Sequence, residues 1–300
     1  MNLPAEPVHR SGFAALVGRP NVGKSTLLNA LVGQKLSIVT PRPQTTRHRI
    51  LGIYSSPEVQ IAFLDTPGLH RDASRALNKA MNRTATAALE EADVVVLVLE
   101  ALKWTAEDDL ALERLRRSGR AAIAAVNKVD RVRPRERLLP YLAALGQRHA
   151  FLEVVPVSAL RSDNIEILRH AIARHLPAGP ALFPPGELTD RGIEFRIAEM
   201  IREKLTLELN QEVPYGIAVE VERLTRAEGH LTVDAAIWVD REGQKPIVIG
   251  AKGARLKRIG TAARLTLNEM LQERLHLNLW VKVRENWADN ARALKELGLE

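Results

Sequence analysis

The feature that most constrains this chain is an alternation of short apolar runs with amphipathic stretches between residues 13 and 176. The apolar runs have the length of buried strands, and the stretches between them have helical spacing. Strands that alternate with helices need crossover connections, which build a parallel sheet covered on both faces. The pattern predicts an α/β unit with strands at 13–17, 61–64, 94–99, 121–126 and 154–157 and helices at 24–32, 75–90, 107–117, 135–145 and 164–176.

A further strand at about 48–54 is expected to pair beside 61–64 as an antiparallel edge. The composition changes at residues 177–185, which contain four prolines and one glycine, as in a stiff linker. Beyond it the order is α+β: a helix at 193–209, β-rich runs at 217–224 and 231–239, a helical pair at 247–273 and a strand at 277–283. We therefore place a first domain at 1–178, a linker at 179–190 and a second domain with a C-terminal tail at 191–300.

The amino-acid composition argues against membrane-spanning, secreted and cysteine-dependent classes of protein. Apolar residues make up 46% and charged residues 26%, as in soluble globular proteins. No apolar run approaches the roughly 18 residues that span a bilayer, and the first residues lack an apolar signal segment, so we expect no secretion. Cysteine is absent, which excludes disulfides and thiolate metal sites and suits a reducing cytoplasm. The net charge of +7 favours nucleic acid or an anionic membrane surface as partner; a basic surface that only aids solubility is the alternative.

A phosphate-binding loop lies between the first predicted strand and helix. Its sequence, GRPNVGKS, fits G-x-x-x-x-G-K-[ST]. Glycines let backbone N–H groups converge on phosphate oxygens, and the helix that follows adds its positive end. Lys24 supplies a charge to the β- and γ-phosphates, and Ser25 offers a hydroxyl to Mg²⁺. The residues expected to contact the nucleotide here are Gly18, Arg19, Pro20, Asn21, Val22, Gly23, Lys24, Ser25 and Thr26.

Two further segments complete the phosphate site. The tetrapeptide 65–68, DTPG, follows an apolar strand, so its carboxylate can hold Mg²⁺ directly or through water, and the Gly68 N–H can sense a γ-phosphate. Residues 40–47 are rich in Pro and Thr without apolar periodicity, as in a mobile switch loop. Thr45 and Thr46 both qualify as the switch threonine, and we favour Thr46. The predicted nucleotide contacts are Asp65, Thr66, Pro67, Gly68 and Leu69; the Mg²⁺ ligands are Ser25, Thr46 and Asp65; the catalytic groups are Lys24, Thr46 and Gly68.

The tetrapeptide Asn127-Lys128-Val129-Asp130 ends a predicted strand and identifies the base. The Asp130 carboxylate accepts hydrogen bonds from guanine N1–H and its exocyclic amine, both of which adenine lacks. The stem of Lys128 can lie along the purine, and Asn127 can tie this loop to the phosphate loop. After the next strand, a backbone N–H can approach guanine O6; this loop comprises Ser158, Ala159 and Leu160. In this order, the motifs predict a GTP-binding, GTP-hydrolysing protein.

The hydrolysis step departs from the usual pattern. Many small GTPases place a water-positioning Gln directly after the DxxG glycine, but this chain has Leu69, whose side chain cannot orient water. We therefore expect slow intrinsic hydrolysis, or help from elsewhere. This resembles the hydrophobic-substituted class of GTPases, in which an Asn at the position of Asn21 helps to bind K⁺ in place of an arginine finger. The neighbouring His70 is expected to be solvated rather than catalytic.

The informative stretch of the second domain is 247–260, which contains Gly250-x-x-Gly253. In the KH fold such a loop clamps about four nucleotides of single-stranded backbone. From 252 to 264 the chain has five cations and no acid, a local nucleic-acid footprint. Trp238 and Trp280 are expected to be sheet residues rather than stacking platforms. The predicted RNA contacts are Gly250, Ala251, Lys252, Gly253, Arg255, Lys257 and Arg258.

The chain resembles the Era family of bacterial ribosome-assembly GTPases over nearly its full length, on the motifs GRPNVGKS, PRPQTTRHR, DTPGLH, KWTAEDDL, NKVD, EVPYGIAVEVE, QKPIVIGAKGARLKRIG, LWVKVRENW and ALKELG. Residues 71–81 depart most from the family pattern. The resemblance implies an α/β P-loop GTPase domain with a mainly parallel sheet, followed by an α+β type II KH domain, with GTP or GDP and Mg²⁺ as cofactors.

The family also implies a cytoplasmic monomer that binds near the 3′ end of 16S rRNA during assembly of the 30S subunit, with peripheral contact to the inner face of the membrane. GTP would strengthen RNA binding, and hydrolysis would promote release. Two rivals stay open. One is a P-loop GTPase of another class whose C-terminal domain binds protein or membrane. The other is a P-loop small-molecule kinase, which the NKVD and DTPG motifs disfavour.

Overall fold

The computed structural model describes residues 9–42, 45–68, 76–209, 216–227, 230–296 and 298. The chain divides into two compact units. The first comprises 1–37, 46–73 and 81–190, and the second comprises 38–45, 74–80 and 191–300. Among the described residues, no helix combines the length and the apolar character needed to cross a membrane.

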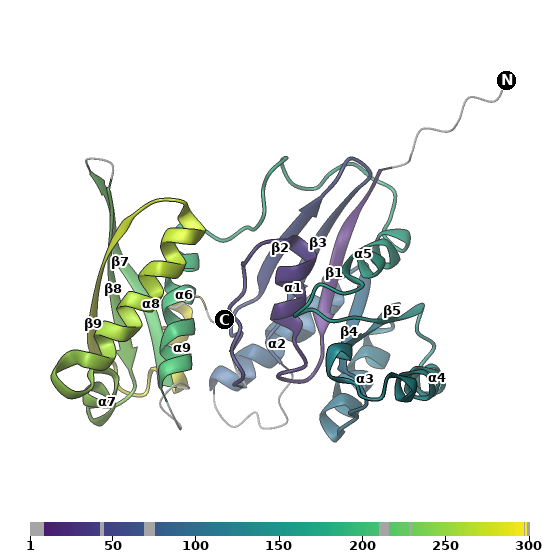
Figure 1. Cartoon of the computed structure of the whole chain (residues 1–300), viewed down its shortest axis with the longest axis horizontal. Coiled ribbons are helices and arrows are strands. Elements are labelled where there is room, and N and C mark those ends of the chain that lie inside the picture. The colour runs from purple at the N-terminus through teal and green to yellow at the C-terminus, as the bar shows by residue number, and fades with distance from the viewer. Residues whose placement is uncertain are drawn as a thin grey trace. The chain divides into compact units, whose positions relative to one another are not determined.

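The first unit is built on a six-stranded sheet with the strand order β2-β3-β1-β4-β5-β6 (Figure 1). β2 pairs antiparallel with β3 at one edge, and the remaining neighbours are parallel. The predicted parallel sheet and its antiparallel edge strand are thus confirmed. The strands are β1 (Arg10–Val17), β2 (Ile50–Ser55), β3 (Val59–Asp65), β4 (Val94–Glu100), β5 (Ala122–Asn127) and β6 (Glu153–Pro156).

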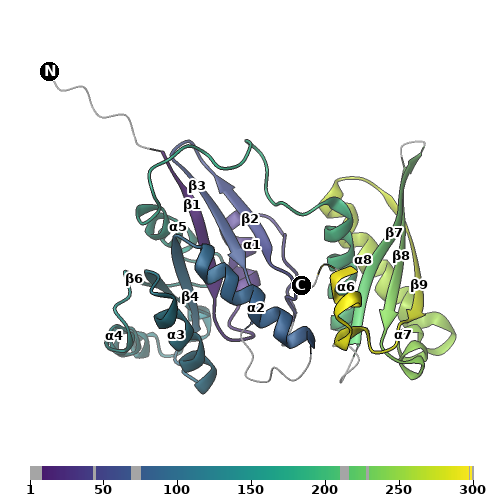
Figure 2. The ribbon, with the colours of Figure 1, turned by 180° about the vertical axis from the view of Figure 1, so that it is seen from behind.

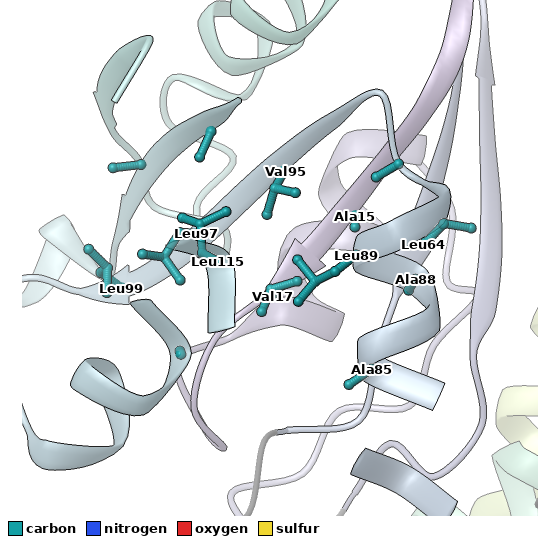
Figure 3. Close-up of a cluster of buried hydrophobic side chains, with 14 of the residues drawn as sticks. Ala15, Val17, Leu64, Ala85, Ala88, Leu89, Val95, Leu97, Leu99 and Leu115 are labelled. Atoms are coloured by element: carbon teal, nitrogen blue, oxygen red, sulfur yellow. The ribbon is translucent and has the colours of Figure 1, made fainter. Parts of the chain in front are cut away.

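Helices cover both faces of this sheet, as predicted. They are α1 (Lys24–Val32), α2 (Ala76–Glu91), α3 (Ala106–Ser118), α4 (Leu138–Arg148) and α5 (Ile165–Arg174). Alternate strand residues such as Val95, Leu97 and Leu99 point to one face, because strand side chains alternate, and pack there against α2, α3 and α4 (Figure 3). α1 and α5 lie on the other face (Figures 1 and 2). Parallel strands buried on both sides explain the nearly continuous apolar runs in the sequence.

The predicted linker, 179–190, belongs to the first unit rather than standing free of it. The Gln60 side chain in β3 binds it, since its Oε1 accepts from the Leu182 and Phe183 N–H groups at 2.6 and 2.8 Å, and its Nε2 donates to the Phe183 carbonyl at 3.0 Å. The Phe183 ring also meets Phe13 edge-on, with ring centroids 6.3 Å apart. The buried Gln60 side chain thus fixes this segment to β3, a contact that the Pro/Gly pattern alone does not predict.

The second unit has the element order α-β-β-α-α-β expected of a type II KH domain. β7 and β8 are antiparallel, β8 and β9 are parallel, and the sheet order is β7-β8-β9. Helices α6 and α8 pack on the sheet around one apolar core. Trp238 and Trp280 lie in β8 and β9, as predicted. The elements are α6 (Ile193–Glu208), β7 (Ile217–Ala227), β8 (His230–Val239), α7 (Lys245–Ile249), α8 (Ala254–Leu271) and β9 (Leu275–Val283).

The C-terminal tail holds structure that the sequence analysis did not predict. A 3-10 turn at Trp287–Asp289 leads into α9 (Ala291–Glu296). Trp287 is fully buried, and its indole Nε1 donates to the Gly216 carbonyl at 3.1 Å. Leu294 of α9 is buried as well. The tail therefore contributes to the core of the second unit.

Candidate nucleotide-binding and RNA-binding sites

The loop between β1 and α1 wraps so closely that two positions exclude a side chain. A Cβ on Gly18 would lie 2.4 Å from the Val98 carbonyl oxygen. Gly23 has φ +102°, and a Cβ there would lie 2.4 Å from the Asn127 amide nitrogen. Only glycine satisfies both the conformation and the space. The glycines of the motif are thus required by packing against β4 and the base loop, before any ligand is considered.

Lys24, the first residue of α1, is buried under this loop. Its Nζ donates to the carbonyls of Gly18 and Arg19 at 2.9 and 3.0 Å. Burial lowers the pKa of Lys24 to about 8; the nearby Asp65 carboxylate opposes this shift, and Arg19 adds to it. A buried ammonium whose charge is under-compensated, at a helix N-terminus, favours an anion at this position.

Three oxygen-bearing side chains meet beside Lys24. The hydroxyls of Ser25 and Thr46 lie 2.7 Å apart. Asp65 is fully buried: its Oδ2 accepts from Ser37 Oγ at 2.9 Å, while its Oδ1 has no hydrogen-bond partner. Burial raises the pKa of Asp65, and the Lys24 charge opposes that shift. An unpaired buried carboxylate oxygen beside two hydroxyls fits a hard divalent cation that takes its other ligands from phosphate and water.

The two candidate switch threonines make different contacts. The Thr45 hydroxyl lies 2.6 Å from Thr40 Oγ1 and donates to the Arg42 carbonyl at 2.7 Å, so it is engaged within its own segment. The Thr46 hydroxyl instead contacts Ser25, which supports our preference for Thr46.

The end of the DTPG tetrapeptide packs against the phosphate loop. A Cβ on Gly68 would lie 2.9 Å from the Pro20 ring, so its bare backbone borders the loop. The Thr66 hydroxyl donates to the Leu16 carbonyl at 3.0 Å, which fixes the tetrapeptide to β1. Leu69 and His70 lie outside the described residues, as do positions 43 and 44 of the switch loop.

Asn127 makes the predicted connection between the base loop and the phosphate loop. Its Nδ2 donates to the Val22 carbonyl at 2.8 Å, and its Oδ1 accepts from the Ala159 N–H at 3.0 Å. Lys128 Nζ donates to the Asn21 carbonyl at 2.6 Å. One amide therefore joins three loops of the site, and the lysine adds a second connection.

The Asp130 carboxylate is oriented by a neighbour whose role was not predicted. Ser158 Oγ donates to Asp130 Oδ1 at 2.6 Å, so the serine of the last loop holds the carboxylate in place. The sequence analysis assigned only the backbone of this loop to the base. The signal was available, since a hydroxyl residue at the end of an adjacent parallel strand lies at the same edge of the sheet. Leu160 is 73% exposed, so any contact it makes falls to its backbone.

A group of charged residues behind the phosphate loop was also missed. The buried guanidinium of Arg19 donates from Nη2 to Glu100 at 2.8 Å and from Nε to Asp108 at 3.1 Å. Lys128 Nζ lies 3.2 Å from the same Glu100 oxygen. Burial would raise the pKa of Glu100, but these two cations hold it below its ordinary value. The Arg19 side chain therefore faces acids, and only its backbone is left for the nucleotide contact predicted at this position.

The GxxG loop joins α7 to α8 and has an unusual backbone. Gly250 has φ +73°, and a Cβ there would lie 2.7 Å from the Arg255 Cβ. Lys252 has φ +48°, a value that L side chains rarely adopt, and its side chain is exposed. Gly253 has φ +77° with open space where a Cβ would stand. The loop thus presents a cation at its tip and an uncovered backbone beside it.

Beside this loop, α8 and β9 line a groove of about 470 Å³. Lys257, Thr261 and Arg264 line it from one helix face, at the i, i+4, i+7 spacing, and His276 lines it from β9. Five predicted RNA contacts do not line this groove. Gly250, Ala251 and Lys252 belong to the loop beside it, Arg255 donates to the Ile247 carbonyl, and Arg258 donates from Nε to Glu208 at 3.0 Å. The sequence analysis read the basic run as a whole and did not separate the helix faces, so it missed Thr261, Arg264 and His276 as groove residues.

Fold and site together define a P-loop GTPase unit joined to a KH domain. A protein-family model described as a 50S ribosome-binding GTPase matches residues 13–128, and a KH domain model matches residues 212–288. The chain is 50% identical over 296 residues to GTPase Era of Marinobacter nauticus, covering 99% of this chain and 97% of the relative. It is 48% identical over 300 residues to GTPase Era of Xanthomonas oryzae pv. oryzae, covering both chains fully.

Solved structures agree with these relatives. The structure of Aquifex aeolicus Era bound to GDP and AlF4⁻ matches with a TM-score of 0.93 and 38% identity, covering 97% of this chain and 99% of that one. A structure of Era in complex with MgGDPNP and nucleotides 1506–1542 of 16S ribosomal RNA matches with a TM-score of 0.94 at the same identity and coverage. The chain belongs to the Era family of GTPases.

Proposed function

We propose that this protein is a GTP-driven switch that binds the 3′ region of 16S rRNA through its KH domain during assembly of the 30S subunit, as a cytoplasmic monomer. The observation that carries the proposal is the presence in one chain of a guanine-selective nucleotide site and a basic GxxG groove. A solved relative holds both a GTP analogue with Mg²⁺ and a 16S rRNA fragment, which supports the same pair of ligands here.

The nucleotide site has groups for each part of GTP. Lys24 meets the β- and γ-phosphates, because its buried ammonium lies under the phosphate loop. Asp130, oriented by Ser158, accepts from the guanine edge. Ser25, Thr46 and Asp65 would hold Mg²⁺, which would neutralise charge on the phosphates. Gly68 offers its backbone N–H to the γ-phosphate from its place against Pro20.

The chain's own residues supply few groups that could orient the attacking water or stabilise charge during GTP hydrolysis. Leu69 has no group that orients water, and the Arg19 guanidinium is held by Glu100 and Asp108. We therefore assign to Asn21 a role in holding K⁺ near the phosphates. Asn21 has φ +61°, and its carbonyl is held by Lys128, so the residue has a fixed backbone while its side chain is exposed.

RNA binding is assigned to the GxxG loop and the adjoining groove. Lys252 stands at the exposed loop tip, and Lys257 and Arg264 follow along α8. Cations in a row beside an uncovered glycine backbone suit the phosphates of a single strand. The apolar floor provided by Leu277 and Leu279 suits the faces of its bases.

The proposal is tested with the double variant Ala251→Asp/Lys252→Asp and an RNA equivalent to nucleotides 1506–1542 of 16S rRNA. Filter binding should show a loss of RNA affinity on the order of 100-fold, with GTP affinity unchanged. The variant Lys103→Asp/Ala143→Asp makes the same change in charge at exposed positions of the first unit and serves as control. Unchanged RNA retention by the loop variant would refute the KH assignment.

A further inference from the structure

The chain turns directly from the base loop into an arginine-rich segment. Residues 131–137 read RVRPRER, with four arginines and one acid. The segment connects β5 to α4 through two short 3-10 turns, Val129–Arg131 and Arg135–Arg137. The side chains of Arg131, Arg133, Arg135 and Arg137 are all exposed. The function proposed above uses none of them.

Among the described residues, none of these four arginines pairs with an acid, in contrast to two other arginines of the same unit. Arg169 pairs with Glu166, and Arg174 pairs with Glu153. Across the described part of the chain, no ion pair involves the arginines of 131–137, and their one side-chain hydrogen bond joins Arg133 to the Val132 carbonyl at 2.8 Å. Of the acids nearby, Glu100 binds Arg19 and Lys128, and Asp130 accepts from Ser158. Glu136 lies within the segment itself and is exposed.

The surface around the segment is concave on two sides. A hollow of about 210 Å³ is lined by Arg131, Arg133 and Arg137 together with Lys128 and Glu100. A second hollow of about 460 Å³ is lined by Arg135 and by the exposed Arg161, which follows β6, and also by Asp130 and Asp163. Five guanidinium groups from two loops thus surround hollows at the edge of the sheet where the strands end.

We propose that 131–137 and Arg161 form a second RNA contact, on the nucleotide-binding unit, that grips the phosphate backbone of base-paired RNA. The inference rests on the RNA-binding function proposed above. A guanidinium binds a phosphate through two parallel hydrogen bonds. A KH loop accommodates only about four nucleotides, which leaves the phosphates of a longer RNA for other contacts.

Two further features favour a duplex backbone over other anionic partners. Residues 131–137 include no aromatic side chain, so the segment offers no platform for stacking on unpaired bases. Four cations and one acid occur within these seven residues, an excess of positive charge that suits a phosphate backbone. Backbone contacts of this kind position an RNA without reading its sequence.

The test compares two triple variants that remove equal charge. Arg133→Gln/Arg135→Gln/Arg137→Gln alters the proposed contact. Arg116→Gln/Arg117→Gln/Arg120→Gln is the control, since these residues are exposed but precede β5. Because β4 and β5 are parallel, with Val95 opposite Ala122, the control positions lie at the opposite edge of the sheet from 131–137.

Two RNA probes separate the contacts: a single-stranded tail that fills the KH groove, and the same tail extended by a hairpin. Binding is measured with saturating GDPNP over a range of salt concentrations. The first triple variant should bind the tail like the parent but the tail–hairpin RNA about tenfold more weakly, with the slope of log K against log salt smaller by about 2. The control variant should match the parent on both probes.

The proposal is overturned if the first triple variant keeps the parent's affinity for the tail–hairpin RNA, if the control loses as much, or if the parent gains nothing from the hairpin. Weaker binding of the tail by the first triple variant would also contradict it. Failure of the KH assignment gives a different result, because Ala251→Asp/Lys252→Asp would then still bind the tail alone.

Discussion

The same kind of local structure occurs twice in the protein, in the phosphate loop at 18–24 and in the GxxG loop at 250–253. Each is a glycine-containing turn with positive φ values that leads into a helix and carries one lysine. Their surroundings differ. Lys24 is buried beneath its loop with a lowered pKa, whereas Lys252 is exposed at the tip of its loop beside an open groove.

The difference shows that enclosure, rather than the glycine loop itself, decides what kind of phosphate ligand is bound. Around the first loop, the Asn127 side chain joins the base loop to Val22 of the phosphate loop and to Ala159 of the last loop. A desolvated site can reject a ligand that leaves its polar groups unpaired. An open loop has no such penalty to impose, so its affinity comes from charge and depends on salt.

The largest effect is expected on the base selectivity of the nucleotide site, a property that the open GxxG loop lacks. Asp130→Asn should shift the preference from GTP toward xanthosine triphosphate on the order of 10⁴-fold, because the 2-oxo group of xanthine needs a donor. The asparagine oxygen can still accept from Ser158, so the loop should keep its geometry. Competition binding with the two nucleotides measures the change. Unaltered selectivity would refute the role of Asp130 and break the comparison.

A smaller effect should appear with pH. The pKa of Lys24 is lowered to about 8 in the nucleotide-free protein, while bound phosphates favour the ammonium form. GTP binding must then take up a proton as the pH rises past this value, so the affinity should fall about tenfold from about pH 7 to about pH 9. Calorimetry in buffers of different ionisation heat would report the proton uptake.

The control for this pH effect is Lys24→Arg, whose guanidinium stays charged throughout the range. Its affinity for GTP, whatever its absolute value, should not change with pH over that interval. A flat profile for the parent protein would mean that the buried lysine does not titrate on binding. The enclosure of Lys24 would then have no electrostatic consequence.

The smallest expected effect concerns which monovalent cation is present. An enclosed site can distinguish K⁺ from Na⁺ by size and coordination, whereas an open loop responds only to ionic strength. GTP turnover should be severalfold faster in potassium than in sodium buffer at equal ionic strength, and Asn21→Ala should remove the difference. RNA affinity should be the same in both buffers. Equal turnover would argue against the role of Asn21.

Much of this site could be predicted because it depends on strand ends. Parallel strands finish at one edge, so motifs after Val17, Leu64 and Val126 had to converge there. The elements and their order followed from apolar runs of strand length. The contact between Asn127 and the phosphate loop followed from the same logic.

The direction in which a side chain points, and the partner that it meets, could not be predicted, because residue spacing along the sequence does not determine them. The basic run after Gly253 gives the charge of α8, but only packing separates the groove residue Lys257 from Arg258, which is paired with Glu208. The attachment of 179–190 to the first unit depends on contacts distant in sequence, among them the Gln60 side chain in β3 and the Ile53 N–H, which donates to the Leu188 carbonyl. Trp287 and α9 follow the last strand, where composition gave no boundary.

The pairing of Arg19 with Glu100 and Asp108 has a consequence for how GTP hydrolysis by this protein can be regulated. The arginine of the phosphate loop is bound to these two acids, so in the proposed mechanism the additional positive charge that speeds hydrolysis comes from a partner or an ion. The lifetime of the GTP-bound state is then not set by this chain alone. It becomes a property of the surroundings, and a partner or ion can shorten it only by being present at the site.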